Sequence, residues 1–398
     1  MSILFITKEL PYPPNSGCRN RTLNIIKALS KNNKILLLCH GEPEKDVERV
    51  NRMRSLCESV FLVNENKGSR KQRLYIDAFL SLFSLAPFGV NSRYSVSMKD
   101  KAREILSQWQ IDLIICDSIY QVLNMPEKQC FKILSEHNVE SVIIKRYAKV
   151  EKNIFRKAYA LLEWLKMRHY EHKVWPSFDR CIVVSESDRA EMHSRIKNLD
   201  IEVVANGVDT EYFSPRNAKE KPLSLVYMGQ MDWHPNVDAM IYFLTEIYPI
   251  VKKRLPDASL SIIGSNPPEK IKELAKSEPS VKLTGLVDDT RPHIAQGEIF
   301  IVPLRIGGGT RLKILEAMAM GRPIVSTAIG CEGLDAINRR HIMIADSPND
   351  FAEKVTELAN NPALRLELGK NGRKLVEDRY SWNKVVERLY RIGANGNS

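Results

Sequence analysis

The stretch PLRIGGGTRLKILEAMAMGRPIVST, residues 303–327, joins a strand, a turn and a helix in an order that decides the fold. Its apolar start predicts a buried strand that ends at Leu304. Three glycines at 307–309 predict a turn, and Thr310 is a good N-cap. The eleven-residue helical pattern ends at Gly321 before Pro323, as helices commonly do at glycine followed by proline. This order is typical of an α/β protein.

The glycine turn predicts a site for an anionic ligand. Glycines let the backbone approach a ligand closely, and free N–H groups at the start of a helix attract phosphate. Arg311 and Lys313 fall in the predicted first turn, where cations are unfavourable unless an anion is bound. We therefore expect a diphosphate here. The turn is not a Walker loop, because no GKS or GKT follows, and it comes too late in the chain for a dinucleotide fingerprint.

Helical spacing indicates which side chains of this helix face the ligand. Lys313 and Glu316 share one side with Met320, and the opposite side, expected to face the sheet, carries Leu312, Leu315 and Ala319. Glu316 follows the turn at about the distance that separates ribose hydroxyls from a nucleotide diphosphate. The alternative is that Lys313 and Glu316 form an ordinary i,i+3 surface pair, worth a few tenths of a kcal/mol.

Short apolar runs alternate with amphipathic ones along the whole chain, which indicates βαβ units and parallel sheets covered on both faces. In the first half we expect strands at 3–7, 34–39, 112–117, 131–136 and 180–186, with a helix at 18–33. In the second half we expect a helix at 236–254 and strands at 223–229, 258–264, 282–286, 299–304, 323–327 and 341–345. Residues 350–394 predict two or three further helices.

The alternation of apolar and amphipathic runs is interrupted at ANGVDTEYFSP, residues 205–215, and we place a domain boundary there. The predicted fold class is α/β, with two Rossmann-like, doubly wound parallel-sheet domains that face a central cleft. The predicted parts are a first domain at 1–208, a second domain at 209–379 and a terminal helix at 380–398 that returns to the first domain.

Composition excludes several classes of protein. The 398 residues are too many for one ordinary core, and no apolar run reaches the roughly 18 residues of a membrane span. The start, MSILFITKEL, is expected to be a strand and not a secretory signal. Seven scattered cysteines without CxxC spacing favour buried thiols over disulfides or zinc. The net charge is +11, but no run of basic residues interleaved with aromatics indicates nucleic-acid binding.

Most of the excess positive charge lies in the first half. Residues 1–220 hold 35 Lys and Arg against 27 Asp and Glu. The stretch 67–90 joins a basic cluster to an aliphatic and aromatic run. It is either a buried helix with a solvated entry or an element that rests on an anionic bilayer, and the sequence alone leaves both open.

The glycine stretch, together with NGVD at 206–209 and GLVDD at 285–289, resembles the retaining glycosyltransferases of family 4. PYPPNSGCRNR (11–21), EHNVES (136–141) and VVSESD (183–188) are similar to further motifs of that family. The resemblance implies a GT-B fold, in which the second domain binds a nucleotide diphosphate sugar and the first binds the acceptor. It also implies that no cofactor and no metal are needed, because helix dipoles and cations stabilise the leaving group.

The resemblance assigns roles on the donor side. Glu316 matches the second glutamate of the family's Glu-x7-Glu motif and would hold the ribose, while Gly308 stands at the first. Gln230 stands where the family has an arginine, so we expect Arg311 and Lys313 to supply the missing cations. The predicted donor-binding residues are Gly17, Gly229, Gln230, Gly264, Val287, Gly307, Gly308, Gly309, Thr310, Arg311, Lys313 and Glu316.

On the acceptor side, the resemblance implies that the loop of Gly17 approaches the leaving phosphate, although Cys18 replaces the family's second glycine. The predicted acceptor-side residues are Asn15, Ser16, Arg19 and His137. His137 corresponds to the family's histidine near the sugar; alternatively it caps the end of a strand. The predicted catalytic set is His137, Arg311, Lys313 and Glu316.

The implied function is transfer of a hexose from a UDP- or GDP-sugar to a hydroxyl of a glycan or lipid-linked acceptor, as in polysaccharide biosynthesis. We expect a cytoplasmic bacterial enzyme, with a peripheral position on the inner membrane face left open by the basic first domain. The open alternatives are a nucleotide-sugar 2-epimerase of the same fold and a non-enzymatic nucleotide- or nucleic-acid-binding protein. A nicotinamide-dependent oxidoreductase is disfavoured, because PYPPNSG replaces the expected GxGxxG.

Overall fold

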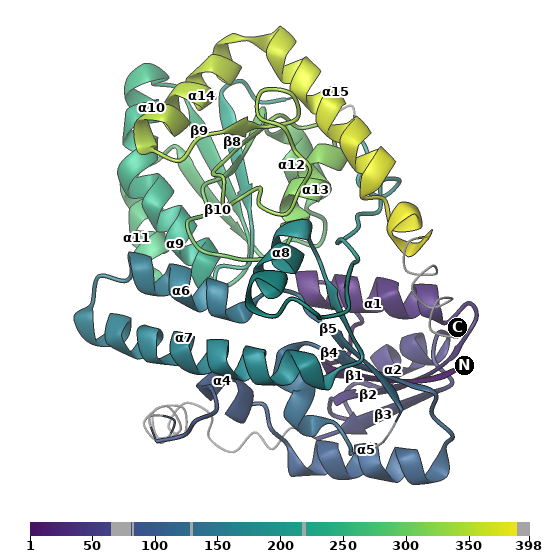
Figure 1. Ribbon diagram of the computed structural model, residues 1–398. Coiled ribbons are helices and arrows are strands. Elements are labelled where there is room, and N and C mark those ends of the chain that lie inside the picture. The colour runs from purple at the N-terminus through teal and green to yellow at the C-terminus, as the bar shows by residue number, and fades with distance from the viewer. Residues whose placement is uncertain (65–80, 82, 128–129, 217–219, 388–398) are drawn as a thin grey trace. The chain divides into compact units, whose positions relative to one another are not determined.

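The computed structural model describes residues 1–64, 81, 83–127, 130–216 and 220–387 (Figure 1). It divides into two compact units: Met1–Val204 with the chain from Val386 onward, and Ala205–Val385. The whole basic part of stretch 67–90, residues 67–73, lies outside the described residues, as does 388–398 of the predicted terminal helix. In the rest of that helix, residues 382–387 are helical.

The first unit contains a seven-stranded parallel sheet in the order β3-β2-β1-β4-β5-β6-β7. The chain winds outward from β1 in one direction and from β4 in the other, so the strand order reverses between these two neighbours. The strands are β1 (Ser2–Glu9), β2 (Lys34–His40), β3 (Ser59–Val63), β4 (Leu113–Asp117), β5 (Phe131–Ser135), β6 (Arg180–Val183) and β7 (Ile201–Val203).

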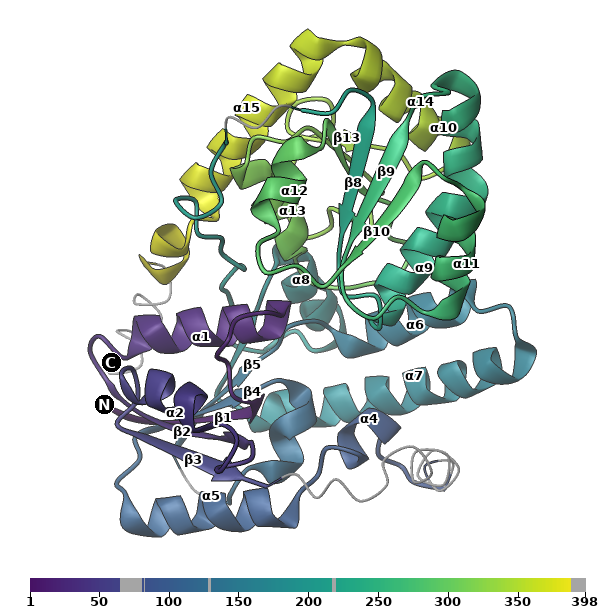
Figure 2. The ribbon, with the colours of Figure 1, turned by 180° about the vertical axis from the view of Figure 1, so that it is seen from behind.

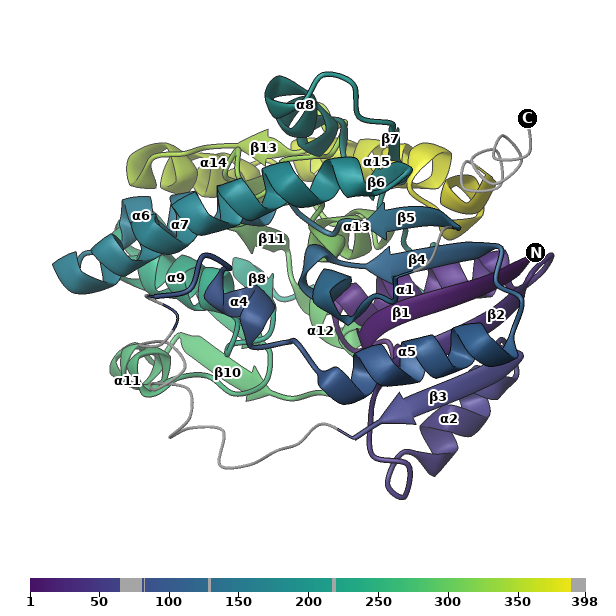
Figure 3. The same cartoon turned by 60° about the horizontal axis from the view of Figure 1, so that its bottom comes forward.

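Helices cover both faces of this sheet. Figure 2 shows α1 and α2 on one side of β1–β3 and α5 on the other, and Figure 3 looks onto α5 where it lies across these strands. The helices are α1 (Gly17–Leu29), α2 (Val47–Arg54), α4 (Phe88–Asn91), α5 (Val96–Gln108), α6 (Glu140–Val150), α7 (Ile154–Val174) and α8 (Glu186–Arg195). Two short 3₁₀ helices are η1 (Ile119–Asn124) and η2 (Trp175–Ser177).

The second unit contains a six-stranded parallel sheet in the order β10-β9-β8-β11-β12-β13. Here the order reverses between β8 and β11. The strands are β8 (Ser224–Met228), β9 (Ser259–Ile263), β10 (Val281–Gly285), β11 (Ile299–Val302), β12 (Ile324–Ser326) and β13 (Met343–Ile344). The predicted fold of two doubly wound α/β domains is therefore confirmed.

The second sheet is buried on both faces because its strands are apolar at successive positions. Along β11, Ile299 and Ile301 enter one core while Phe300 and Val302 enter the other. One layer contains α9 (His234–Tyr242), α10 (Tyr248–Arg254), α11 (Glu269–Ser277) and α14 (Pro348–Asn360). The other contains α12 (Arg291–Gln296), α13 (Leu312–Ala319) and most of α15 (Pro362–Arg379).

The structure corrects two predicted helices of this unit. The helix expected at 236–254 is interrupted by a π-helical segment, η3 (Phe243–Ile247), between α9 and α10. The helix expected from Thr310 begins later: Arg311 is the N-cap residue, its backbone is extended, and α13 ends at Ala319. Thr310 therefore precedes the N-cap, and its carbonyl accepts a hydrogen bond from Asn206 Nδ2 at 3.3 Å.

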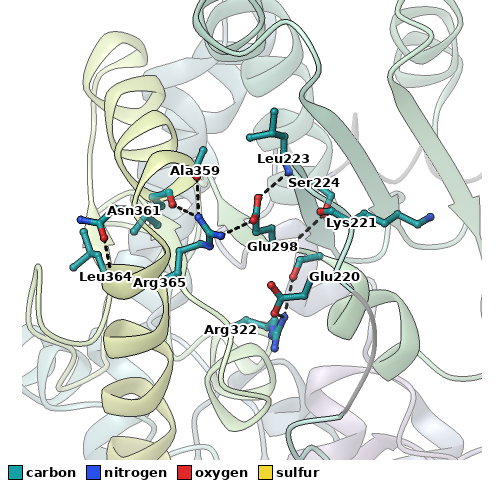
Figure 4. A network of polar contacts seen from close by, with 12 residues as sticks. Glu220, Lys221, Leu223, Ser224, Glu298, Arg322, Ala359, Asn361, Leu364 and Arg365 are labelled. Carbon is teal, nitrogen blue, oxygen red and sulfur yellow. Dashed lines mark hydrogen bonds and ion pairs between the residues drawn. The ribbon is translucent and has the colours of Figure 1, made fainter.

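A polar network fixes the amino-terminal edge of the second sheet to α15 (Figure 4). The Glu298 carboxylate accepts hydrogen bonds from the Leu223 backbone N–H at 2.8 Å and from Arg365 Nη2 at 2.6 Å. Arg365 also donates to the carbonyls of Leu358 and Ala359 at the end of α14. Glu298 is buried, so its charge requires this pairing. The network leaves the opposite, carboxyl-terminal edge as the place where loops carry function.

Candidate functional site

The carboxyl ends of β8, β9 and β10 in the second unit are each formed by glycine. Gly229 follows β8, Gly264 follows β9, and Gly285 ends β10. A Cβ atom on Gly264 would lie 1.9 Å from the Gly229 carbonyl oxygen, so the two loops pack backbone against backbone. These glycines let the backbone loops pack closely beside the reversal point between β8 and β11, where α/β folds bind ligands.

Lys313 extends across this reversal point. It belongs to the first turn of α13, yet its Nζ donates to Tyr227 Oη at 3.0 Å on β8 and to Asn236 Oδ1 at 2.8 Å on α9. The ammonium also lies 4.3 Å from the centre of the Tyr227 ring. Burial, reinforced by the neighbouring positive charge of Arg311, lowers the pKa of Lys313 to about 7.

Arg311 folds back onto the glycine turn. Its guanidinium donates to the carbonyl oxygens of Gly308 and Gly309, and at 3.4 Å to that of Ile329. Residues 307–310 are buried as a result, although the sequence predicts a turn open to a ligand. An anion reaches these backbone N–H groups only when the Arg311 side chain moves, and that side chain would then be free to pair with the anion.

Glu316 lies one helical turn beyond Lys313 and is half-buried. Burial raises the pKa of its carboxyl group to about 7, and the attraction of Lys313 opposes that rise. Within the described ranges, neither a hydrogen bond nor an ion pair joins Glu316 to another side chain. Lys313 is instead held by Tyr227 and Asn236, so the alternative of an ordinary Lys313–Glu316 surface pair is wrong.

The predicted orientation of the side chains on α13 is only partly correct. Leu315 and Ala319 are buried as expected, whereas Leu312 is half-buried. Met320, placed by the spacing on the side of Lys313, is buried as well. Thus α13 is enclosed on nearly all sides, and the polar opening is confined to Lys313 and Glu316.

The remaining predicted donor-side residues surround this edge. Gln230 is exposed, and its backbone carbonyl accepts a hydrogen bond from Asn236 Nδ2 at 2.8 Å. Val287 packs against the core, and Asp289 accepts from the Arg291 backbone N–H at 2.9 Å, at the start of α12. Two large apolar side chains that the sequence did not single out, Trp233 and Leu286, are 53% and 82% exposed at the same edge.

In the first unit, His137 and Asp117 form a pair at the carboxyl edge of the sheet. His137 Nε2 lies 2.8 Å from Asp117 Oδ1. Asp117 also accepts hydrogen bonds from Thr7 Oγ1 at 3.0 Å and Thr22 Oγ1 at 2.6 Å. These bonds and the imidazolium hold the pKa of Asp117 below its usual value despite burial.

The same pair keeps His137 charged. Although burial opposes charging, the Asp117 carboxylate and a hydrogen bond with Cys18 raise the pKa of His137 well above its usual value. The buried Arg21 lies near the same two groups, and burial lowers its pKa to about 10. The pairing with Asp117 therefore favours the charged form of His137. Sequence reasoning missed Asp117, although its position as the last residue of β4, at the reversal point, was an available signal.

The predicted acceptor-side residues lie around the start of α1. Ser16 is the N-cap, and its Oγ accepts from the Arg19 backbone N–H. The Arg19 guanidinium pairs with Glu9 and donates to Asn15 Oδ1 at 3.0 Å. Gly17, the first residue of α1, is exposed. The structure thus brings Asn15, Ser16 and Arg19 together, and Arg19 pairs with Glu9 at the end of β1.

A polar groove of about 460 Å³ lies beside Arg19, at the carboxyl ends of β1 and β2. Cationic and anionic side chains alternate along it: Lys8, Glu9, Arg19, Glu42, Lys45 and Asp46. Among the residues that the structure describes, no group of three or more His, Cys, Asp or Glu side chains is arranged to hold a metal ion.

Two models of known protein families match this chain. Residues 16–212 match the family model described as Glycosyltransferase Family 4, and residues 222–361 match the model described as Glycosyl transferases group 1. The chain belongs to the family 4 glycosyltransferases. The activity of this family is glycosyl transfer. Lys313, Glu316 and His137 are candidate site residues for that activity.

Three relatives illustrate the range of this family. An uncharacterized 44.6 kDa protein in the cps region of Klebsiella pneumoniae is 26% identical over 98% of this chain and 99% of its own. A GDP-mannose-dependent monoacylated alpha-(1-6)-phosphatidylinositol monomannoside mannosyltransferase of Corynebacterium glutamicum is 28% identical over 48% of this chain and 55% of its own. The capsular polysaccharide biosynthesis glycosyltransferase CapM of Staphylococcus aureus is 28% identical over 46% and 52%.

Solved structures share the fold over nearly the whole chain. Sucrose-phosphate synthase of Thermosynechococcus elongatus has a TM-score of 0.73 at 15% identity and covers 99% of this chain and 98% of its own. Anabaena Alr3699/HepE, solved in complex with UDP-glucose, has a TM-score of 0.64 at 11% identity and covers 99% and 100%. At these identities the likeness supports the GT-B fold alone.

Proposed function

We propose that this glycosyltransferase moves a hexose from a UDP- or GDP-sugar to a hydroxyl of a glycan or lipid-linked acceptor, with retention at the anomeric carbon, in polysaccharide biosynthesis. The observation that carries the proposal is the Lys313 ammonium, held by Tyr227 and Asn236 beside Arg311 at the reversal point of the second sheet. Two neighbouring cations, of which Arg311 helps to lower the pKa of Lys313, suit a ligand with at least two negative charges.

A nucleotide diphosphate fits this arrangement. The diphosphate would pair with Lys313 and, after release from the glycine turn, with Arg311, while Glu316 accepts hydrogen bonds from ribose hydroxyls. The mannosyltransferase relative is named for GDP-mannose, and the HepE structure holds UDP-glucose. These names support a nucleotide sugar without distinguishing the base.

The proposed mechanism follows the charges. Cleavage of the anomeric C–O bond builds positive charge on the sugar and negative charge on the departing diphosphate, which Lys313 and Arg311 stabilise. Gly308 offers no carboxylate to act as a nucleophile. We therefore favour attack by the acceptor hydroxyl on the face from which the diphosphate leaves, with its proton passing to a departing phosphate oxygen.

The acceptor is assigned to the first unit. The groove beside Arg19 offers both hydrogen-bond donors and acceptors, as a polyhydroxylated sugar requires. His137, kept charged by Asp117, would hold a sugar hydroxyl or an anionic oxygen near the start of α1. Neither a metal nor a cofactor is part of this mechanism.

The first experiment is a thermal-shift screen with UDP-, GDP-, ADP- and CDP-sugars. A donor at 100 times its Kd stabilises the protein by about 2.7 kcal/mol, which such a screen detects easily. The stabilising donor is then incubated with and without glycan acceptors, and the product anomer is assigned by NMR. Conversion of the sugar without any acceptor would indicate the 2-epimerase alternative, and no stabilisation by any nucleotide sugar would overturn the proposal.

We place the enzyme at the cytoplasmic face of the membrane, on which lipid-linked acceptors are presented. The relative that acts on a phosphatidylinositol mannoside supports a lipid-linked acceptor. No helix among the described residues is long and apolar enough to cross a bilayer.

A further inference from the structure

Helix α7 in the first unit buries several charged side chains and exposes several aliphatic ones. Its buried positions include three charged residues, Glu163, Lys166 and Glu171. Its exposed positions Ile154, Leu161 and Leu165 repeat at helical spacing along one face. A helix of a globular protein normally buries such aliphatic residues and exposes its charges. Both the buried charges and the exposed aliphatic residues of α7 therefore need a physical reason.

The inward charges have that reason within the unit. Glu163 Oε2 accepts from the Phe88 backbone N–H at 2.7 Å, and Lys166 pairs with Glu163 and donates to the Ser81 carbonyl oxygen. Glu171 pairs with Arg195 at 2.6 Å and accepts from the Ser141 backbone N–H at 2.8 Å. Every buried charge of α7 is thus paired, as low-polarity surroundings require.

The outward apolar residues are instead exposed to solvent. Six large side chains, exposed by between 41% and 91%, lie on α7 and on the neighbouring segment 83–88. This segment is tied to α7 through Ser81, whose Oγ lies 3.1 Å from Tyr159 Oη, and through the Phe88–Glu163 bond. We call these six the α7 surface: Phe83, Leu85, Ile154, Phe155, Leu161 and Leu165.

Positive charge surrounds the α7 surface. Figure 1 shows α6 and α7 as an antiparallel pair joined by a short loop, with α4 against α7. Residues 140–174, which form this pair, hold nine Lys and Arg and four Glu, a net charge of +5. Glu140 accepts hydrogen bonds from Tyr120 Oη and Asn138 Nδ2. Glu163 and Glu171 are buried, and Glu151 is bonded to Tyr147 and Asn153. The exposed charges are therefore mainly cationic: Lys145, Lys149, Lys152, Arg156, Lys157, Arg168 and Lys173.

We propose that the α7 surface docks on the anionic face of a lipid bilayer. Exposed aliphatic and aromatic side chains ringed by Lys and Arg enter the boundary between headgroups and acyl chains while the cations pair with lipid phosphates. This inference rests on the proposed function, since it supplies the surface that brings the enzyme to a lipid-linked acceptor.

Charge decides between a bilayer and a second copy of this chain. Two copies that met through the α7 surface would place cations against cations, which costs association energy. An anionic bilayer offers both parts of the complement, apolar depth and negative phosphate. A soluble acidic partner offers only charge unless it also carries an apolar groove.

Vesicle sedimentation of the full-length protein tests the proposal. The wild type should sediment with phosphatidylcholine–phosphatidylglycerol vesicles, but only weakly with phosphatidylcholine alone, and about 0.5 M NaCl should reduce the bound fraction. Replacing Leu161 and Leu165 together by Gln should weaken binding at least about tenfold, since two inserted aliphatic side chains are lost. Arg156→Glu with Lys157→Glu should weaken it to a similar extent.

Matched controls lie on α15 in the second unit. Leu366 is 59% exposed, and Leu366→Gln should leave vesicle binding unchanged. The Lys374 side chain is 77% exposed, and Lys374→Glu gives the control for charge. All substituted side chains face solvent, so unfolding midpoints should stay near the wild-type value.

Three results would overturn the proposal: no binding to anionic vesicles, binding that the α7 variants leave intact, or a wild-type dimer that Leu161→Gln with Leu165→Gln dissolves. Donor-induced thermal shifts on the same variants separate this inference from the proposed function. A normal donor shift without vesicle binding would contradict only the proposal that the α7 surface docks on a membrane. Vesicle binding without any donor shift would contradict only the proposed function.

Discussion

The Nζ atom of Lys313 lies 2.8 Å from Oδ1 of Asn236, which also accepts a hydrogen bond from Tyr227 Oη at 2.8 Å. These bonds connect α13 to α9 and β8, the elements on the two sides of the reversal point of the second sheet. They hold the ammonium in one place before any ligand arrives. Such preorganisation is what stabilises a developing negative charge at low cost.

Replacing Lys313 by Met should weaken donor binding about 10- to 100-fold, the range expected when a hydrogen bond to a charged group is lost. Lys313→Arg should fall between wild type and Lys313→Met, because it keeps the charge but changes the geometry at Asn236 and Tyr227. Isothermal titration with the stabilising nucleotide sugar measures both. Lys374→Met, at an exposed position of α15, is the control. Equal affinities for Lys313→Met and wild type would remove Lys313 from the donor site.

Donor binding should also consume protons above neutral pH. The pKa of free Lys313 is about 7, so at pH 8 most molecules lack that proton. A bound diphosphate favours the ammonium and raises the pKa, so binding at pH 8 should take up close to about one proton per site. Affinity should fall as the pH rises above 7, where Lys313 loses its charge.

Titration calorimetry in two buffers of different ionisation enthalpy measures this uptake. Lys313→Met should show none at pH 8. Glu316 has a pKa of about 7 as well, so Glu316→Gln is measured beside it. Uptake that persists in Lys313→Met but vanishes in Glu316→Gln would assign the proton to the carboxyl group instead.

Much of the fold was predictable because the central strands are almost continuously apolar, as strands buried on both faces must be. Runs such as 3–7 and 34–39 became β1 and β2 with ends shifted by at most two residues. The edge strands β3 and β7 were missed. They are short and only partly buried, so their sequences carry little of that signal.

The site was predictable where one helix carried it. Lys313 and Glu316 emerged from spacing along α13, whereas Tyr227 and Asn236 come from another part of the chain and meet Lys313 only in the folded sheet. Thr310 was misassigned as the N-cap because the Arg311 guanidinium holds the glycine turn and keeps the backbone extended, a contact that no local pattern reveals. The burial of charged side chains by α7 likewise depends on partners distant in sequence.

Removing the charge of Asp117 should lower the pKa of His137. The Asp117 carboxylate and its hydrogen bond raise that pKa in the folded protein, and Asp117→Asn leaves burial, which lowers it. Titration of the imidazole Cε1–H resonance by NMR should therefore show a downward shift, with the other histidine resonances as internal controls. Transfer should lose its activity at a lower pH in the variant, since neutral His137 no longer attracts an anionic oxygen. An unmoved His137 titration would contradict the pairing.

Cys18 should be the rapidly alkylated thiol. It is exposed at the first turn of α1, whereas five other cysteines are buried and Cys130 is half-buried. Burial raises the pKa of the Cys57 thiol to about 12 and that of Cys331 to about 11, so both stay protonated and slow to react. Iodoacetamide followed by peptide mass spectrometry should find Cys18 labelled first. Cys18→Ser should abolish the fast phase, and a fast phase that survives in this variant would place the reactive thiol elsewhere.

Gly264→Ala should disrupt the donor edge of the second unit through the backbone. The new Cβ would lie 1.9 Å from the Gly229 carbonyl oxygen, so the loops after β8 and β9 must separate. Steric overlap in a packed interior costs about 1–3 kcal/mol, and a backbone conformation that L residues rarely adopt adds about 1–3 kcal/mol.

Gly285→Ala provides the matched control, because it shares a positive φ of +72° but has open space where its Cβ would stand. It should pay only the conformational cost of about 1–2 kcal/mol. Urea unfolding should thus rank the wild type above Gly285→Ala and Gly285→Ala above Gly264→Ala. Gly264→Ala should lower donor affinity more than Gly285→Ala. The new side chain at 264 would displace Gly229, which lies against Lys313 and Asn236. Equal losses in the two variants would show that φ strain alone, and not contact between the loops, requires glycine at 264.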